Sequence, residues 1–201
     1  MFRDPYRHLF FEANAASHRI SHESLGLKWS DQVIAERLNL GLGSRLLVAG
    51  LTSPEILPAL RLRLGLTGQL VIVDPSDEAL KKVSQNDAFW AMVLKANLEQ
   101  IPIMEASMDA VLCWSSYMNL GPLSQVTNEF FRVLAPGGRV FITYSGRAHP
   151  LSPRPCLTGL QSLFIKTGFS RLDSEIEEDF FLFKAEKVAG FSLPMSRMGN
   201  A

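Results

Sequence analysis

The chain has 201 residues, with 20 basic and 20 acidic side chains, and 47% of its residues are hydrophobic. This composition is typical of a single globular domain and argues against an intrinsically disordered chain. A net charge of zero gives no support to nucleic-acid binding or to attachment to an anionic membrane. The two cysteines lie far apart in the sequence, which indicates neither a disulfide framework nor a zinc site.

The N-terminal part of the chain, residues 1–43, is expected to form a helical extension that acts as a lid. Ser30 can cap a helix that continues to the glycines at 41 and 43. His18 and His22 would share a helical face, but they have no evident third ligand, so we interpret them as surface or lid histidines and expect no metal. The sequence shows neither an apolar signal segment nor a run of about 20 apolar residues that could span a bilayer. We therefore expect a cytoplasmic protein without a membrane partner.

Four short apolar runs predict strands at 45–50, 69–74, 109–114 and 139–144. Their residues do not alternate with polar ones, which is typical of strands in a parallel sheet that is covered on both faces. In a parallel sheet of this kind, helices connect successive strands, so the segments between the runs are expected to be helical.

The connecting segments show helical spacing of their apolar residues. Pro58 is expected in the first turn of the helix after the first strand, where proline is tolerated. Residues 78–95 predict a further helix, with an interruption at SQND, residues 84–87, as the alternative. Residues 123–138 predict another, which is ended by Pro136 and the Gly137-Gly138 pair.

The C-terminal part of the chain changes character. A helix over 157–168 is expected to end at Gly168, and two strands at 169–176 and 179–187 follow. Only a few acidic residues join these strands, so they must pair antiparallel. The sequence therefore predicts a doubly wound α/β domain over residues 44–188, with a mostly parallel sheet closed by an antiparallel C-terminal hairpin. A flexible tail is expected over 189–201.

Ligands of parallel α/β sheets bind beyond the carboxyl ends of the strands. The residues just after Gly50, Asp74, Asn97 and Trp114 are therefore expected to face one shared crevice. Asp109, by contrast, is expected to have a structural role at the start of its strand.

Three stretches of the chain match a known pattern. They are NLEQIPIMEASMDAVLCWSSYMNL at 97–120, FFRVLAPGGRVFI at 130–142, and GF at 168–169 followed by FFLFKAEK at 180–187. Together they resemble the class I S-adenosylmethionine-dependent methyltransferases, in particular the small-molecule, type 11-like group, from about residue 43 to residue 187. The resemblance implies a Rossmann-like, seven-stranded sheet, S-adenosylmethionine as cofactor, and a small-molecule or lipid-like acceptor as substrate. A homodimer is the one protein assembly that we consider.

The resemblance also implies roles for individual residues. Asp74 would accept hydrogen bonds from both ribose hydroxyls, whereas the alternative is a turn or helix-capping carboxylate ahead of Pro75. Asn97 would accept a hydrogen bond from the adenine amino group, although it could equally be a plain loop asparagine. Leu98 would present its backbone N–H to the adenine ring. The remaining residues expected to bind the cofactor are Gly50, Thr52, Pro75, Trp114 and Ser115.

The first glycine-rich motif of the family is altered in this chain. Val48 occupies its acidic position, Gly50 is its first glycine, and Thr52 and Pro54 replace the later glycines. Gly50 can still form the sharp turn out of the strand, but Thr52 brings a branched Cβ toward the cofactor. Losing the acidic partner costs about 1.5–3 kcal/mol, which weakens binding roughly ten- to a hundredfold without abolishing it.

Methyl transfer depends largely on positioning, and a base is needed only when the acceptor must lose a proton. His149 is the preferred candidate for that base and Tyr117 is the second, although either could instead be a cap, turn or packing residue. Two functions therefore compete: an S-adenosylmethionine-dependent methyltransferase, and a catalytically inactive binding or partner module of the same fold. A nicotinamide-dependent oxidoreductase is disfavoured, because no G-x-G-x-x-G follows the first strand.

Overall fold

The computed structural model describes residues 31–50, 54–85, 90–114, 122–145, 156–177 and 180–188. Within these ranges the chain forms, in order, α1 (Asp31–Arg37), β1 (Arg45–Ala49), the 3₁₀ helix η2 (Pro54–Ile56), α2 (Leu57–Leu64), β2 (Gln69–Asp74), α3 (Asp77–Gln85), β3 (Met92–Lys95), β4 (Met108–Trp114), α4 (Leu123–Val133), β5 (Leu134–Ser145), α5 (Leu157–Thr167), β6 (Ser170–Glu177) and β7 (Phe180–Glu186). The predicted tail and most of the predicted lid lie outside the described residues. Of the helices that the structure describes, none is long and apolar enough to cross a bilayer.

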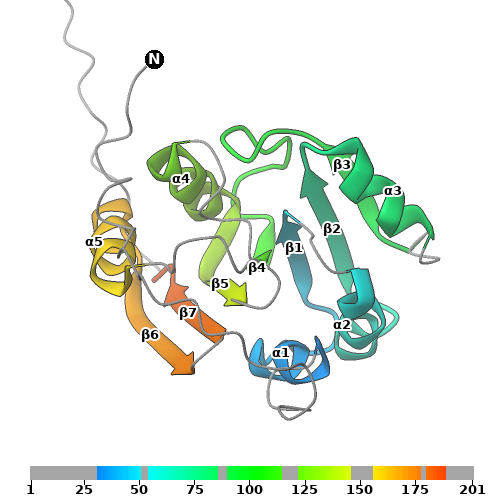
Figure 1. Ribbon diagram of the computed structural model, residues 1–201, viewed down its shortest axis with the longest axis horizontal. Coiled ribbons are helices and arrows are strands. Elements are labelled where there is room, and N and C mark those ends of the chain that lie inside the picture. The colour runs from blue at the N-terminus through cyan, green and yellow to red at the C-terminus, as the bar shows by residue number, and fades with distance from the viewer. Residues whose placement is uncertain are drawn as a thin grey trace, which may run out of the picture.

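Seven strands form one sheet in the order β3-β2-β1-β4-β5-β7-β6 (Figure 1). The first five strands of this order pair parallel, and β7 lies antiparallel between β5 and β6. This arrangement confirms the predicted doubly wound α/β sheet with a reversed C-terminal hairpin. The chain adds strands outward from β1 to one edge and from β4 to the other, so the strand order reverses between β1 and β4.

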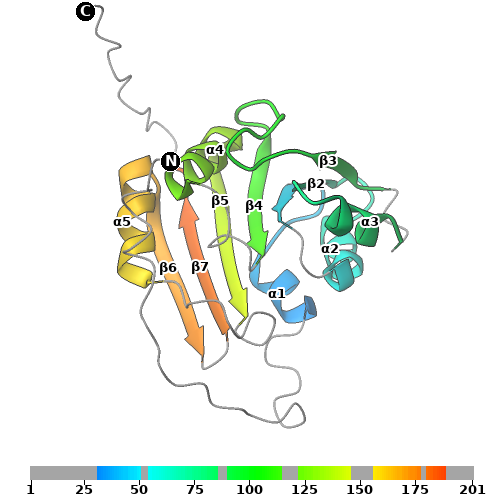
Figure 2. The same ribbon diagram turned by 45° about the horizontal axis from the view of Figure 1, so that its top comes forward.

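Both faces of the sheet are covered, which explains why the strands are apolar along their whole length. On one face, Leu47 and Ala49 of β1 belong to a core that includes side chains of α4 and α5. On the other face, Leu46 and Val48 belong to a core with side chains of α1 and α2. Figures 1 and 2 show these helix pairs on the two sides of the sheet. Because consecutive strand residues point to opposite faces, an uninterrupted apolar run is what two covered faces require.

The helix predicted over residues 78–95 is wrong in its second half. The helix α3 ends at Gln85, and β3 pairs parallel with β2 along its four residues. As an edge strand β3 has only one partner, and its Met92 and Val93 are 59% and 38% exposed. The apolar character of these two residues therefore does not mark the buried face of a helix.

Two helices, α1 and α4, end earlier than the glycines that follow each of them predict. Instead of continuing to Gly41 and Gly43, α1 ends at Arg37, because Asn39 adopts a left-handed conformation with φ of 46°. Asparagine tolerates this conformation better than most residues, so it can end a helix in the way that glycine does.

The end of α4 depends on a residue from the C-terminal end of the described chain. This helix ends at Val133, ahead of Pro136, and β5 begins with the next residue. The Lys187 ammonium donates hydrogen bonds to the carbonyls of Phe131 at 2.7 Å and Leu134 at 2.8 Å. A cation thus satisfies carbonyls that the last turn of a helix leaves without an intrahelical partner.

Two other helix boundaries follow the sequence. Pro58 lies in the first turn of α2, as predicted. Gly168 ends α5 with a left-handed φ of 107°, and the N–H of Phe169 then bonds back to the carbonyl of Phe164 at 3.0 Å. This is the Schellman arrangement, in which a left-handed glycine allows the chain to close over the last turn of a helix.

Candidate functional site

The carboxyl ends of β1, β2 and β4 lie side by side where the strand order reverses. Ala49 at the end of β1 pairs with Val73 of β2 on one side and with Cys113 of β4 on the other. Gly50 then leaves β1 with a left-handed φ of 71°, and its N–H donates to the carbonyl of Val73 at 2.9 Å. This geometry confirms the sharp turn expected at Gly50. It also places the end of the first strand at the point where ligands of doubly wound sheets bind.

Asp74 is the last residue of β2, and its side chain lies beside this point. Only 7% of Asp74 is exposed, and its Oδ1 accepts the N–H of Ser76 at 2.7 Å. The turn role that was the alternative for Asp74 is therefore present. A carboxylate can accept about four hydrogen bonds, so a turn contact is compatible with further contacts to ribose hydroxyls.

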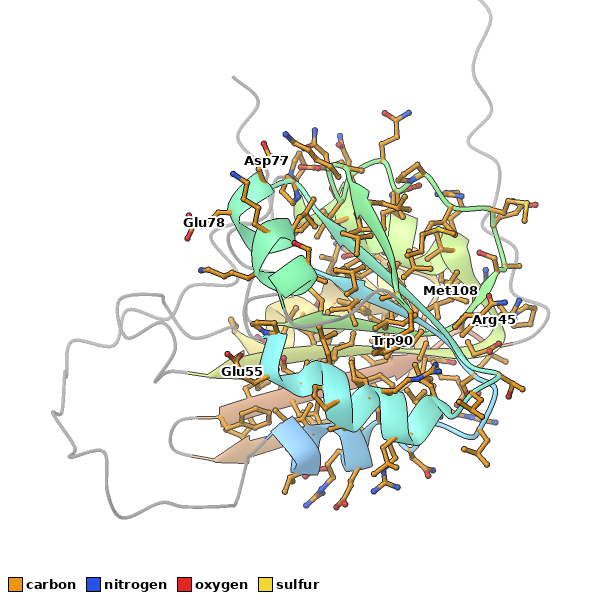
Figure 3. The ribbon with its side chains drawn as sticks, turned by 90° about the vertical axis from the view of Figure 1, so that its right-hand side faces the viewer. Arg45, Glu55, Asp77, Glu78, Trp90 and Met108 are labelled. Carbon is orange, nitrogen blue, oxygen red and sulfur yellow. The ribbon has the colours of Figure 1, made fainter. Side chains whose placement is uncertain are left out.

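The helix α3 begins directly after this turn. The Oγ of Ser76 accepts the N–H of Ala79 at 3.3 Å, so Ser76, and not Asp74, caps the helix. A serine directly before an acidic first turn is a local signal by which the sequence could have identified this cap. Figure 3 shows Asp77 and Glu78 at the start of α3, at the far end of the sheet from Arg45.

Electrostatics also place Asp74 close to the end of β4. The pKa of the Cys113 thiol is raised far above its ordinary value, mainly by burial and additionally by the negative charge of Asp74. Such a thiol stays protonated and does not act as a nucleophile at neutral pH. We therefore assign Cys113 to the core beneath the strand ends.

Asn97 and Leu98 follow β3 and begin the loop that leads to β4. Asn97 is exposed, and its carbonyl accepts the N–H of Gln100 at 3.2 Å, which closes a turn. The side chain of Leu98 is 1% exposed and belongs to the core on the α4 and α5 face. Leu98 thus anchors the loop in the core while the neighbouring Asn97 is exposed, and both the adenine contact and the plain loop role stay open for Asn97.

An open hollow of about 820 Å³ lies between this loop and α4. It is lined by loop residues 100–104 and by Lys95, Ala96, Glu129 and Arg132. The hollow begins at the carboxyl end of β3 and includes neither Gly50 nor Asp74. In the part of the chain that the structure describes, no three His, Cys, Asp or Glu side chains are placed to hold a metal ion.

Of the remaining predicted site residues, only Pro75 has a described side chain. Pro75 is exposed directly after Asp74, and Trp114 ends β4 without a described side chain. The others lie outside the described residues; they are Thr52, Ser115, Tyr117 and His149.

The structural role predicted for Asp109 is confirmed, because its carboxylate binds the backbone and the guanidinium of Arg45 at the start of β1.

Comparison with known proteins gives one family match. Residues 47–142 match the model of a family described as a methyltransferase domain. This range runs from β1 into β5 and includes Asp74, Asn97 and Leu98. No curated protein sequence matches the chain.

Solved structures of similar fold cover most of the chain. A methyltransferase from Aquifex aeolicus that depends on S-adenosylmethionine is 19% identical over 92% of this chain and 94% of its own, with a TM-score of 0.65. A chain from the complex of the Haloferax volcanii Trm112 methyltransferase activator with a methyltransferase is 16% identical over 81% and 90%, with a TM-score of 0.67. The [4+2]-cyclase SpnF is 18% identical over 80% of each chain, with a TM-score of 0.67. At these identities the likeness is one of fold, and this fold serves more than one chemistry.

Proposed function

We propose that the chain is a class I S-adenosylmethionine-dependent methyltransferase, which transfers a methyl group from S-adenosylmethionine to a small-molecule or lipid-like acceptor in the cytoplasm. The observation that supports this proposal best is the buried carboxylate of Asp74, which lies at the end of β2 beside the left-handed turn at Gly50. This carboxylate and this turn stand where strand order reverses.

The donor and acceptor groups on the described strand ends suit an adenosyl ligand. Asp74 would accept hydrogen bonds from the ribose hydroxyls, and Asn97 and Leu98 would bind the adenine edge with an amide oxygen and a backbone N–H. Gly50 would let the chain turn away from the ligand without a Cβ in its path.

When bound, S-adenosylmethionine supplies an electrophilic methyl group, so the protein's main task is to hold the acceptor in line with it. Where the acceptor must lose a proton, His149 and Tyr117 are our candidates for the base. The proposed set of cofactor contacts is completed by Thr52, Pro75, Trp114 and Ser115. That the protein forms a homodimer stays a prediction.

The alternative is a binding module of the same fold that has lost catalysis. Val48, in the position where the family carries an acidic residue, is fully buried in the core with α1 and α2, so it offers the cofactor no polar group. The cyclase of similar fold shows that such sheets also serve other chemistry. The loss of one charged hydrogen-bond partner costs about 1.5–3 kcal/mol, which leaves a weakened site rather than none.

Calorimetric titration with S-adenosylhomocysteine tests the proposal. We expect micromolar binding by the unaltered chain, and a loss of roughly ten- to a hundredfold in Asp74→Asn, because the neutral amide binds hydroxyls more weakly. Asn can still accept the Ser76 N–H, so the turn should survive the substitution.

Asp77→Asn is the matched control, since Asp77 is a nearby carboxylate that is exposed and paired with Lys95 at 2.6 Å. Its affinity should stay within about twofold of the unaltered chain, as expected for a surface ion pair. No measurable heat with millimolar S-adenosylhomocysteine would refute the enzyme and leave the binding module.

A further inference from the structure

The loop between β3 and β4, residues 96–107, is held from outside by two side chains of α4. The N–H of Ile101 donates to Glu129 Oε2 at 2.7 Å, and the carbonyl of Ile101 accepts from Arg132 Nη2 at 2.7 Å. Arg132 Nη1 also donates to the carbonyl of Ile103 at 2.7 Å. Both backbone groups of Ile101 thus have side-chain partners, which a loop without a ladder of its own needs wherever it is buried.

The two side chains are also locked to each other. Arg132 Nε donates to Glu129 Oε1 at 2.7 Å, and Arg132 Nη2 donates to Oε2 at 2.7 Å. The planar guanidinium therefore meets the carboxylate in a bidentate pair while its free edge binds the loop. Burial raises the pKa of Glu129, but the hydrogen bonds from Arg132 and from the Ile101 N–H lower it by more, so the carboxylate is ionised at neutral pH.

The residue that is held lies close to the predicted adenine contacts. Asn97 and Gln100 close a turn through the carbonyl of Asn97, and Ile101 follows directly. Leu98 and Ile101 are 1% and 2% exposed and belong to the same core. Asn97 and Leu98 are therefore linked to Ile101 through one short segment that has a closed turn and two buried anchors.

We propose that Glu129 and Arg132 are positioning residues for base recognition: they hold the 96–107 loop so that Asn97 and the backbone N–H of Leu98 meet the edge of an adenine and reject a hypoxanthine. This inference rests on the proposed function. Adenine offers a ring-nitrogen acceptor and an amino donor, whereas hypoxanthine carries an N–H and a carbonyl at the same two places. The fixed N–H of Leu98 would oppose the N–H of hypoxanthine whichever way the Asn97 amide is turned.

The test compares the affinities of S-adenosylhomocysteine and S-inosylhomocysteine by calorimetry. The unaltered chain should prefer the adenine compound by about a hundredfold or more, because a site built around hydrogen bonds rejects a mismatched partner strongly. In Arg132→Lys, which keeps the charge but not the fork, the preference should fall by about tenfold or more, because small displacements are costly in such sites. Glu129→Gln keeps an acceptor for the Ile101 N–H, and we expect it to lower the preference by a smaller factor in the same direction.

Asp109→Asn is the control for lost stability, because it weakens contacts at the opposite end of the sheet. It should destabilise the fold and leave the ratio of the two affinities unchanged. A purely structural role of Arg132 would likewise leave that ratio unchanged, and an unchanged ratio in both α4 variants would overturn this inference alone. Absence of S-adenosylhomocysteine binding by the unaltered chain would instead overturn the proposed function and this inference with it.

Discussion

Asp109→Ala should separate the amino ends of β1 and β4. Asp109 Oδ2 accepts the backbone N–H of Arg45 at 2.8 Å, and the carboxylate also binds the Arg45 guanidinium through Nη2 at 2.6 Å and Nε at 3.2 Å. The backbone pairing of these strands begins only at Leu46 and Ala110. The side chain of Asp109 therefore adds a hydrogen bond beyond the end of the ladder. Figure 3 shows Arg45 near Met108, the residue that precedes Asp109.

The size of the effect follows from the two kinds of contact. The side chains of Arg45 and Asp109 are 37% and 41% exposed, so their ion pair contributes about 0–1 kcal/mol to the free energy of unfolding. The hydrogen bond from the backbone N–H to a charged acceptor contributes about 1.5–3 kcal/mol. Asp109→Ala should therefore cost about 1.5–4 kcal/mol and lower Tm by about 3–16 °C in a domain of this size.

Urea denaturation of a double-mutant cycle measures these parts separately. Arg45→Met removes the guanidinium and keeps the backbone N–H, so it should cost about 0–1 kcal/mol, and its coupling energy with Asp109→Ala should be equally small. If Arg45→Met costs as much as Asp109→Ala and the coupling energy equals the whole loss, the ion pair holds the strands and our reasoning is wrong.

Two further predictions concern pH and the end of α5. Hydrogen bonds from Arg45 lower the pKa of Asp109 below its ordinary value of 3.8, against a smaller opposing effect of burial. The ionised Asp109 therefore stabilises the fold fully above pH 3.8, and this stabilisation is lost as the pH falls through the lower pKa of the folded state. Urea midpoints measured at successively lower acid pH should fall less steeply in Asp109→Asn than in the unaltered chain. Equal slopes in the two proteins would contradict this. Gly168→Ala forces a Cβ into a left-handed conformation and should cost about 1–2 kcal/mol in thermal unfolding, whereas Gly168→Asn should cost less; equal losses in both variants would mean that strain at this φ is not the cause.

Local patterns in the sequence predict most of the sheet. The apolar runs at 45–50 and 69–74 correspond to β1 and β2, because burial of both faces of the sheet requires apolar residues along the whole strand. Gly168 ends α5 because its left-handed conformation is a property of the residue itself. The antiparallel hairpin follows from the short connection between its strands.

Other elements depend on partners that lie far away in the chain. Only pairing with β2 defines β3, and its exposed Met92 and Val93 suggest a helix when they are considered alone. The carbonyls at the end of α4 are satisfied by Lys187, more than fifty residues later in the chain. No pattern within the α4 segment indicates that contact.

The candidate site likewise has residues that the sequence predicts and contacts that only the tertiary structure shows. Gly50 and Asp74 could be predicted from the sequence, because a residue at the carboxyl end of a parallel strand faces the ligand edge in any doubly wound sheet. The contacts that Glu129 and Arg132 make with Ile101 and Ile103 could not, because they join residues 28 to 31 positions apart. The spacing of apolar residues within a segment shows which of its faces is buried. The hydrogen-bond partners of a loop depend instead on how a distant helix is rotated against the sheet. The sequence by itself thus determined which segments form the sheet, and only tertiary packing decided how the loop at its edge is held.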